Sequence, residues 1–208
     1  MKMKAILFTS LALSGCYLSH TVADDGEPRC GDGLVQAGEV CDDGGEEGGT
    51  CSDDCRLPLP PPCGGEWTVL DSPDRHRSSA TVGELRCDRV TRTPPSPTGL
   101  FTDPTPADYR GIAWYRFEGA AGSGMTLEPP PAGHCGGDAT GWLAQPPPSI
   151  GDGVIDRDVC FRLFEDECFY ARRIRVAHCD EFILYELAEA PQCQLRYCGD
   201  DIDVAAFR

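Results

Sequence analysis

Val154-Ile-Asp-Arg-Asp-Val-Cys160-Phe-Arg-Leu-Phe164 is the stretch that decides the fold, because it joins a β-type run to a cysteine. Shorter β-type runs lie at residues 66–70, 112–117, 174–177 and 182–187. Clusters of glycine and proline at residues 119–124, 129–131 and 146–148 favour turns and irregular loops. After the N-terminal segment, the helical period of about 3.6 residues does not persist over a helix-length window. The sequence therefore predicts a mostly β fold with extensive loops.

Thirteen cysteines in 208 residues add a second constraint. Cys16 stands alone after an apolar N-terminal segment. The other twelve form a compact group of four and a dispersed group of eight: Cys30, Cys41, Cys51 and Cys55, then Cys63, Cys87, Cys135, Cys160, Cys168, Cys179, Cys193 and Cys198. Because each group is even, each can pair internally as a disulfide framework in an oxidising compartment. The predicted fold class is small, disulfide-rich and mostly β, with two stapled modules behind a signal peptide.

The N-terminus explains the odd cysteine. Residues 1–15 combine two lysines with a short apolar run, as in a secretory signal, and the run is shorter than the roughly 20 residues that span a bilayer. Leu13-Ser14-Gly15-Cys16 resembles the bacterial lipobox. This resemblance implies lipidation at Cys16, export, and anchoring to the membrane of the bacterial envelope, at the outer membrane or cell surface. The alternative is an ordinary signal peptide that leaves Cys16 as a free thiol.

Charge restricts the partners. The chain has a formal net charge of −16, and removing Lys2 and Lys4 with the signal segment lowers it to −18. Nucleic-acid binding depends on a cationic surface, so nucleic acid is excluded as a partner. An acidic surface instead favours the solubility of an exported domain.

Composition also predicts the domain boundaries. Residues 16–29 form a lipidated cysteine and tether, 30–55 a first module, 56–62 a proline-rich linker, 63–198 a larger domain and 199–208 an acidic tail. The linker has four prolines in the six residues 57–62, which impose a stiff, extended spacer.

Residues 30–55 resemble the Myxococcus cysteine-rich repeat. The matching features are Cys30-Gly-Asp-Gly33, then Gly38-Glu-Val-Cys-Asp-Asp-Gly44, then Cys51 and Cys55 spaced as Cys-x₃-Cys. The family usually has an asparagine where this chain has Gly45. A segment of this length cannot bury a useful core, so two cross-links must replace one.

Two metal hypotheses accompany this module. The four cysteines form one alternative, a zinc site, which an oxidising compartment disfavours. Calcium is the better motivated cofactor, because carboxylates stand beside glycine turns: Asp32, Glu39, Asp42 and Asp43, with Asp53 as a further candidate. Ordinary turn chemistry, in which a carboxylate accepts bonds from nearby amides, explains the same residues.

The larger domain carries a second resemblance. Its stretches include Trp67-Thr-Val-Leu-Asp-Ser-Pro73, Trp114-Tyr-Arg-Phe-Glu-Gly119, Gly141-Trp-Leu143, Phe182-Ile-Leu-Tyr-Glu-Leu187 and Leu195-Arg-Tyr-Cys198. In order and spacing, residues 63–198 resemble the eight-cysteine domain of uromodulin and its relatives. The resemblance implies an extracellular fold. Relatives have further cysteines where this chain has Glu128-Pro-Pro and Phe169, which implies that one bridge of the wider pattern is missing.

The relatives' role in displaying a glycan does not carry over. Their glycosylated segment corresponds to Trp142-Leu-Ala-Gln-Pro146, and the chain contains no asparagine and hence no acceptor site. The ligand of the domain is thus left open between an extracellular protein and a glycan.

No catalytic residues are predicted. His134 and His178 directly precede cysteines, and neighbours in an extended segment point to opposite sides, so neither forms a nucleophile–base pair. Among the aromatic residues, Trp114, Phe117 and Trp142 are expected in the core. The alternative hypothesis is a sugar-stacking or protein-binding patch formed by Trp114, Tyr115, Trp142, Tyr170, Tyr185 and Tyr197.

The sequence thus predicts a non-enzymatic cell-surface lipoprotein that presents a stapled module for extracellular binding or adhesion. Two alternatives stay open: a structural envelope protein without a dedicated ligand, and an enzyme acting on glycans, for which the carboxylate pairs Asp156/Asp158 and Glu165/Asp166 are candidates.

Overall fold

A computed structural model describes residues 29–36, 39, 41–45, 51–57, 59–91 and 108–208. The predicted signal segment 1–15, the lipidation site Cys16 and nearly all of the tether 16–29 lie outside these residues, so their assignments stay predictions. Within the described residues, no helix has the length and apolar character needed to cross a membrane.

The described chain is built of strands, most of them short, and single turns of 3₁₀ helix, which confirms the prediction of a mostly β fold. The division into two modules behind a signal peptide stays a prediction. The strands are β1 Thr68–Leu70, β2 Ala113–Phe117, β3 Gly124–Met125, β4 Ala139–Leu143, β5 Val154–Leu163, β6 Asp166–His178, β7 Ile183–Leu187, β8 Leu195–Tyr197 and β9 Gly199–Asp200. The 3₁₀ turns are η1 Pro61–Gly64, η2 Pro73–Arg75, η3 Gly119–Ala121 and η4 Val204–Phe207.

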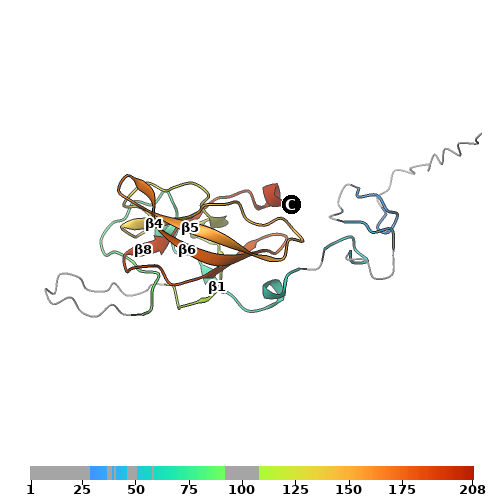
Figure 1. Cartoon of the computed structure of the whole chain (residues 1–208), viewed down its shortest axis with the longest axis horizontal. Helices are drawn as coiled ribbons and strands as arrows, with labels where there is room; N and C mark the ends of the chain where they lie inside the picture. The colour runs from blue at the N-terminus through green and yellow to red at the C-terminus, as the bar shows by residue number, and fades with distance from the viewer. Residues whose placement is uncertain (1–28, 37–38, 40, 46–50, 58, 92–107) are drawn as a thin grey trace, which may run out of the picture.

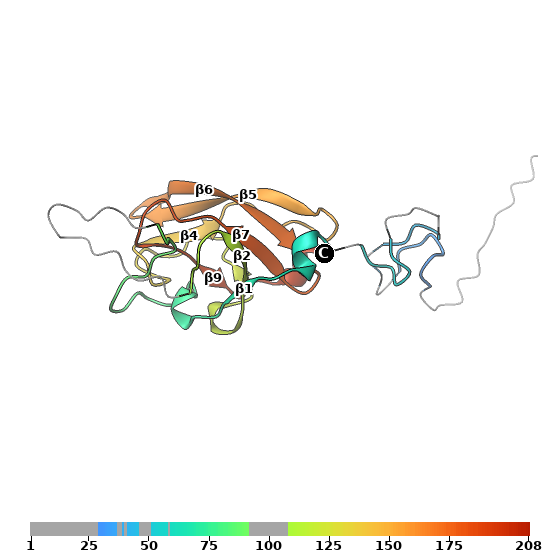
Figure 2. The same ribbon diagram turned by 90° about the horizontal axis from the view of Figure 1, so that it is seen from below.

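Seven strands form one mixed sheet in the order β1-β2-β7-β6-β5-β4-β8, and β3 pairs with β9 in a small second sheet. Figure 1 labels β4, β5, β6 and β8 of the larger sheet. The pairs β1–β2 and β4–β8 are parallel, and the other pairs are antiparallel. The β5–β6 hairpin is the longest feature of the sheet and runs along its length (Figure 2). Its closed end is the turn at residues 164–165, and its open end lies where β5 begins at Val154 and β6 ends at His178.

Each of the five predicted β-type runs overlaps a strand, but β4 and much of β6 escape sequence reasoning. In β4, Gly141 interrupts the apolar pattern; an added Cβ there would lie 2.8 Å from the Phe161 ring, so close strand packing requires glycine. β6 extends from Asp166, well before the predicted start at 174, because its outer half is exposed on both faces and carries polar residues. A strand in such a place has no buried face to produce alternation.

Aromatic residues dominate the main core. Phe117, Tyr115, Tyr185 and Tyr197 are fully buried, and the Phe117 and Tyr185 rings meet edge-to-face at 5.6 Å. The predicted core position of Phe117 is confirmed. The hypothesis of a binding patch is wrong for these three tyrosines, because no ring face reaches the surface. Each tyrosine hydroxyl instead bonds to backbone: Tyr115 and Tyr197 donate to carbonyls, and Tyr185 accepts from the Met125 amide.

Trp114 and Trp142 are only partly buried, which corrects their assignment to the core. Trp114 packs at the edge of a smaller cluster, with the Arg175 guanidinium 5.7 Å from its ring centre. The Trp142 indole Nε1 donates to the Glu167 carbonyl at 2.9 Å. An indole that must place its N–H on a partner near the surface cannot be fully enclosed.

Six disulfides join the twelve remaining cysteines within the two groups. The pairs are Cys30–Cys55, Cys41–Cys51, Cys63–Cys179, Cys87–Cys193, Cys135–Cys198 and Cys160–Cys168. Because the first four sulfurs are bonded in pairs, no thiolate is left there and the zinc alternative is wrong. Three bridges of the larger domain close long loops, so they fasten its first segments to its last strands.

The prediction that residues 199–208 form an acidic tail outside the larger domain is wrong, because they belong to that domain. β9 pairs with β3, and Ile202, Val204 and Phe207 pack against the main core. The apolar residues of this segment stand between acids, so the high local charge leads to the prediction of a tail and the apolar positions are overlooked.

A buried ion network joins the connecting segments to the sheet. The Arg75 guanidinium is fully buried and makes paired bonds of 2.6–2.7 Å to Asp88 and of 2.6 Å to Asp108, and it also donates to the Tyr197 carbonyl at 2.9 Å. Arg196, also fully buried, contacts Asp108 at 3.3 Å and Asp74 at 2.8 Å. Burial raises the pKa of Asp108, but the hydrogen bonds and charges of the two arginines outweigh it and leave that pKa lowered.

Asp88→Ala is expected to lower the free energy of unfolding by about 3–5 kcal/mol, because it leaves a buried guanidinium without one of its two carboxylates. Urea denaturation of the full chain, followed by tryptophan fluorescence, measures this change. A Cys16→Ser background removes the predicted lipid attachment and keeps the protein in solution.

Asp158→Ala is the matched control, because Asp158 pairs with Arg173 at 3.0 Å on the exposed surface. It should leave the denaturation midpoint nearly unchanged. Equal losses from the two variants would contradict a special role for the buried network.

Candidate functional site

The small module is organised around one carboxylate. Asp42 accepts backbone N–H bonds from Gly31 and Asp32 on Oδ2, at 2.8 and 3.1 Å, and from Gly33 and Gly44 on Oδ1, at 2.9 and 2.8 Å. Gly31, Gly33 and Gly44 all have positive φ, which lets successive amides turn toward one anion. The Gly44 amide, with the other three, lowers the pKa of Asp42 and outweighs the opposing effect of desolvation.

The other predicted calcium ligands also bond to nearby amides. Asp32 accepts from the Leu34 amide at 2.9 Å, Glu39 from Gln36 at 2.8 Å and Asp43 from Cys51 at 3.1 Å. Atoms of Glu39, Asp42 and Cys55 lie within 4.8 Å of one another, but the Cys55 sulfur is bonded to Cys30 and carries no charge. The geometry assigns these carboxylates to turn formation, and calcium binding stays a prediction.

Neither histidine beside a cysteine has a nucleophile next to it. Cys135 and Cys179 are in disulfides with Cys198 and Cys63. His178 is buried, with its two ring nitrogens 3.1 Å from the carbonyl oxygens of Pro148 and Asp180. It therefore joins loops to the sheet. The candidate carboxylates Asp156, Asp158, Glu165 and Asp166 lie exposed or half-buried along the β5–β6 hairpin, and none of them lines either of the two pockets described below.

The larger domain has a polar pocket at the end of the sheet where β2 finishes. Its volume is about 210 Å³, and its walls come from the end of β2, the η3 turn, the loop before β7 and the C-terminal segment. Arg116 stacks on the Phe182 ring at 4.3 Å, and Phe182 in turn packs against Trp67 at 5.3 Å between ring centres. We call this hollow the Arg116 pocket.

Three carboxylates line the pocket together with the stacked arginine: Glu118, Glu181 and Asp201. The Arg116 Nε is shielded from solvent and has no hydrogen-bond partner among the described residues, with the nearest Glu118 oxygen 3.8 Å away. Gly122, which also lines the pocket, has φ +95°, and an added Cβ would clash with the Asp200 carbonyl. An aromatic face, a fixed guanidinium and carboxylates can together hold a ligand that carries hydroxyl or amino groups.

Part of the larger domain is similar to a known protein family. Residues 115–199 match the family model of the uromodulin-like eight-cysteine domain. The match covers most of the seven-stranded sheet, from β2 to the start of β9, and it includes most residues of the Arg116 pocket. The sequence resemblance to uromodulin is thus supported; the cysteine-rich repeat and the lipoprotein signal stay predictions.

Three curated relatives show the extent of the similarity. The chain is 29% identical over 161 residues to pancreatic secretory granule membrane major glycoprotein GP2 of Rattus norvegicus, covering 76% of this chain and 25% of that protein. For the protein of the same name in Canis lupus familiaris the identity is 31%, over 64% of this chain and 22% of the relative. Uromodulin of Rattus norvegicus is 35% identical over 44% of this chain and 14% of its own length. The chain thus spans a quarter or less of these relatives.

Sequence reasoning missed the Arg116 pocket and the Arg75 network. Both use residues from distant parts of the chain, and none of their arginines stands in a recognisable motif. The only signal was position: Asp88 follows a cysteine, and Arg116 and Arg196 lie inside stretches that carry the resemblance to uromodulin.

Asp42→Ala is expected to open the small module at a constant calcium concentration, because four backbone amides lose the carboxylate that accepts their hydrogen bonds. Hydrogen exchange at Gly31, Gly33 and Gly44, measured by NMR on the full chain, should become much faster. Asp53→Ala, which alters an exposed acid of the same module, is the control and should leave these rates unchanged.

A calcium titration of the unmodified chain in the same experiment separates the two explanations. Slower exchange on adding calcium, lost in Asp42→Ala, would establish a metal role. Rates that do not respond to calcium would leave turn formation as the only role of Asp42.

Proposed function

We propose that this protein is an exported, lipid-anchored and non-enzymatic binding or adhesion protein of the bacterial cell surface. The uromodulin-like domain is the part that contacts a ligand, and the small repeat and proline-rich segment set it apart from the membrane. The observation that carries the proposal is the Arg116 pocket, a hollow lined by carboxylates in which the Arg116 guanidinium is stacked on the Phe182 ring.

The disulfides support the extracellular part of this proposal. Six bridges are stable only in an oxidising compartment, and the domain would lose its long-range cross-links in a reducing one. One relative is a major membrane glycoprotein of pancreatic secretory granules by name. A binding role for an exported module is consistent with both observations.

The pocket favours a glycan or a polar protein side chain as the ligand. Glu118, Glu181 and Asp201 offer acceptors for hydroxyl or ammonium groups, and the Arg116 guanidinium offers donors. Phe182 supplies an aromatic base beneath the arginine. The alternative is a structural envelope protein without a dedicated ligand, for which these groups would only stabilise the fold.

Glu181→Gln is expected to weaken binding of the exported chain to whole cells or to arrayed glycans about three- to tenfold, because it removes one charged acceptor from the pocket. The measurement uses fluorescently labelled full chain in the Cys16→Ser background. Glu84→Gln, at an exposed position remote in sequence from the pocket residues, is the matched control and should bind as the unmodified chain does.

Mild reduction should abolish binding in the same assay if the stapled fold is required. An unmodified chain that binds no cell type and no glycan would favour the structural alternative. Turnover of a glycan by the purified chain would instead support the enzyme alternative.

Lipid anchoring has its own test. Cells that produce the full chain with labelled palmitate should incorporate label into the protein and retain it in the envelope fraction. Cys16→Ser should lose the label and release the protein in soluble form. Label-free, soluble protein from the unmodified gene would show an ordinary signal peptide instead.

A further inference from the structure

The closed end of the β5–β6 hairpin carries an exposed aromatic residue. The turn between the strands consists of Phe164 and Glu165, and the Phe164 residue is 74% exposed. Its φ is +54°, in the left-handed region that a bulky residue rarely occupies. Such an outlier persists only where the surrounding structure holds it, and it is a reason to look for a function at the turn.

Several contacts make this turn rigid. The Cys160–Cys168 disulfide joins the two strands, and the Trp142 indole bonds to the Glu167 carbonyl at 2.9 Å. The Arg162 Nε also donates to the Phe164 carbonyl at 3.3 Å. An exposed ring on a fixed backbone loses little conformational entropy when it enters a pocket, which is the property of a contact that dominates binding energy. We call Phe164 the hairpin knob.

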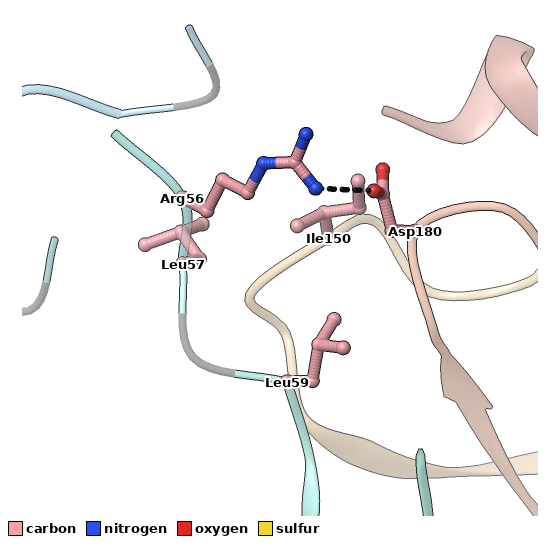
Figure 3. A pocket seen from close by; sticks show the side chains of 5 residues that line it. All are labelled: Arg56, Leu57, Leu59, Ile150 and Asp180. Carbon is pink, nitrogen blue, oxygen red and sulfur yellow. Dashed lines mark hydrogen bonds and ion pairs between the residues drawn. The ribbon is translucent and has the colours of Figure 1, made fainter. Parts of the chain in front are cut away.

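The open end of the same hairpin borders an apolar hollow, shown in Figure 3 and here named the linker pocket. Leu57 and Leu59 come from the linker, and Ile150 comes from the loop before β5. The linker is held against that loop, because an added Cβ on Gly151 would clash with the Leu57 side chain. Arg56 completes the contact with a 3.3 Å ion pair to Asp180.

The linker pocket has the size of one aromatic ring. Its volume is about 50 Å³. A cavity needs about 10–15 Å³ on this scale to hold one water, so the pocket has room for roughly three to five waters, or about 90–150 Å³ of liquid. That amount of space is on the order of a phenylalanine side chain, and the lining offers an apolar ring suitable contacts.

The acids beside the knob complement exposed arginines beside the pocket. The knob is followed directly by a run of three exposed acids at residues 165–167. The pocket rim carries Arg56 and Arg208, whose side chains are 65% and 47% exposed and which both pair with Asp180 at 3.3 Å. Asp54 forms a longer ion pair with Arg56, 3.7 Å from its Nε, and that pair is exposed to solvent. The two guanidinium groups therefore keep donors that face solvent and can attract the acidic turn.

A single chain cannot bring its own knob into its own pocket, because the two lie at opposite ends of the hairpin. β5 has 10 residues, which correspond to roughly 33 Å of strand. We propose that the hairpin knob of one copy inserts into the linker pocket of a second copy. The contact joins two different surfaces, so a pair of copies still presents one free knob and one free pocket, and the assembly grows past the dimer, as an open chain or as a ring where the rotation between copies closes. It does not depend on the Arg116 pocket.

The test uses the full chain in the Cys16→Ser background and measures its mass by sedimentation velocity and light scattering over a wide concentration range. The weight-average mass should rise from that of one copy past that of two without a plateau at the dimer. Phe164→Ser, which removes the knob, and Leu59→Glu, which places a carboxylate in the pocket, should each give a monomer at every concentration. Ile112→Ser removes a similarly exposed apolar residue elsewhere and should associate as the unmodified chain does.

Mixing the two monomeric variants gives the decisive result. Phe164→Ser retains a pocket and Leu59→Glu retains a knob, so an equimolar mixture should form a dimer and stop there. Three outcomes would overturn the proposal. The unmodified chain stays monomeric, the mixture stays monomeric, or each single variant associates as the unmodified chain does.

Charge reversal tests the same contact without altering its apolar part, and it covers the case in which Leu59→Glu disturbs the linker. Arg56→Glu should raise the dissociation constant about fivefold at low salt, and adding Glu165→Arg to the same chain should restore most of the affinity. Identical association of the unmodified, single and double variants would contradict the proposed pairing of rim and knob.

Discussion

Arg75 makes the contact on which the arrangement of the larger domain depends. Its guanidinium bonds at once to Asp88, to Asp108 and to the Tyr197 carbonyl, and these groups come from three segments that are not neighbours in the chain. Asp88 in turn accepts from the Tyr197 amide, so the η2 turn, the segment after Cys87 and β8 are fixed by one charge. A buried guanidinium without these carboxylates would cost several kcal/mol, and the sheet edge therefore closes only in one arrangement.

Disulfides also hold the segments that the ion network joins. Cys87–Cys193 and Cys135–Cys198 join the loops that carry the ion network to the residues that flank β8. Cross-links reduce the entropy of the unfolded chain, whereas the ion network selects among compact states. The two devices together allow a domain with short strands and long loops to hold a single structure.

The small module solves the same problem without arginine. The Asp42 carboxylate accepts hydrogen bonds from four amides on a glycine-rich turn, and two disulfides cross-link the same module. Asp32, Glu39, Asp42 and Asp43 of the module thus accept bonds from backbone amides, whereas Asp88 and Asp108 of the larger domain pair with Arg75. The Arg116 pocket, the hairpin knob and the linker pocket are surfaces of the described residues that such buried charges do not occupy.

The sequence by itself determined the fold class, the even grouping of cysteines, most of the strand positions and the core position of Phe117. These follow from local patterns, because a β-type run, a glycine turn and a disulfide pair depend on residue type and spacing. Only the tertiary structure decided which cysteines pair, that residues 199–208 join the core, and that Tyr115, Tyr185 and Tyr197 are buried. Arg75, Arg116 and Phe164 acquire their roles from partners that are distant in sequence or from solvent exposure at a turn. Neither property leaves a periodic signal, since the physical cause is the packing of the completed sheet.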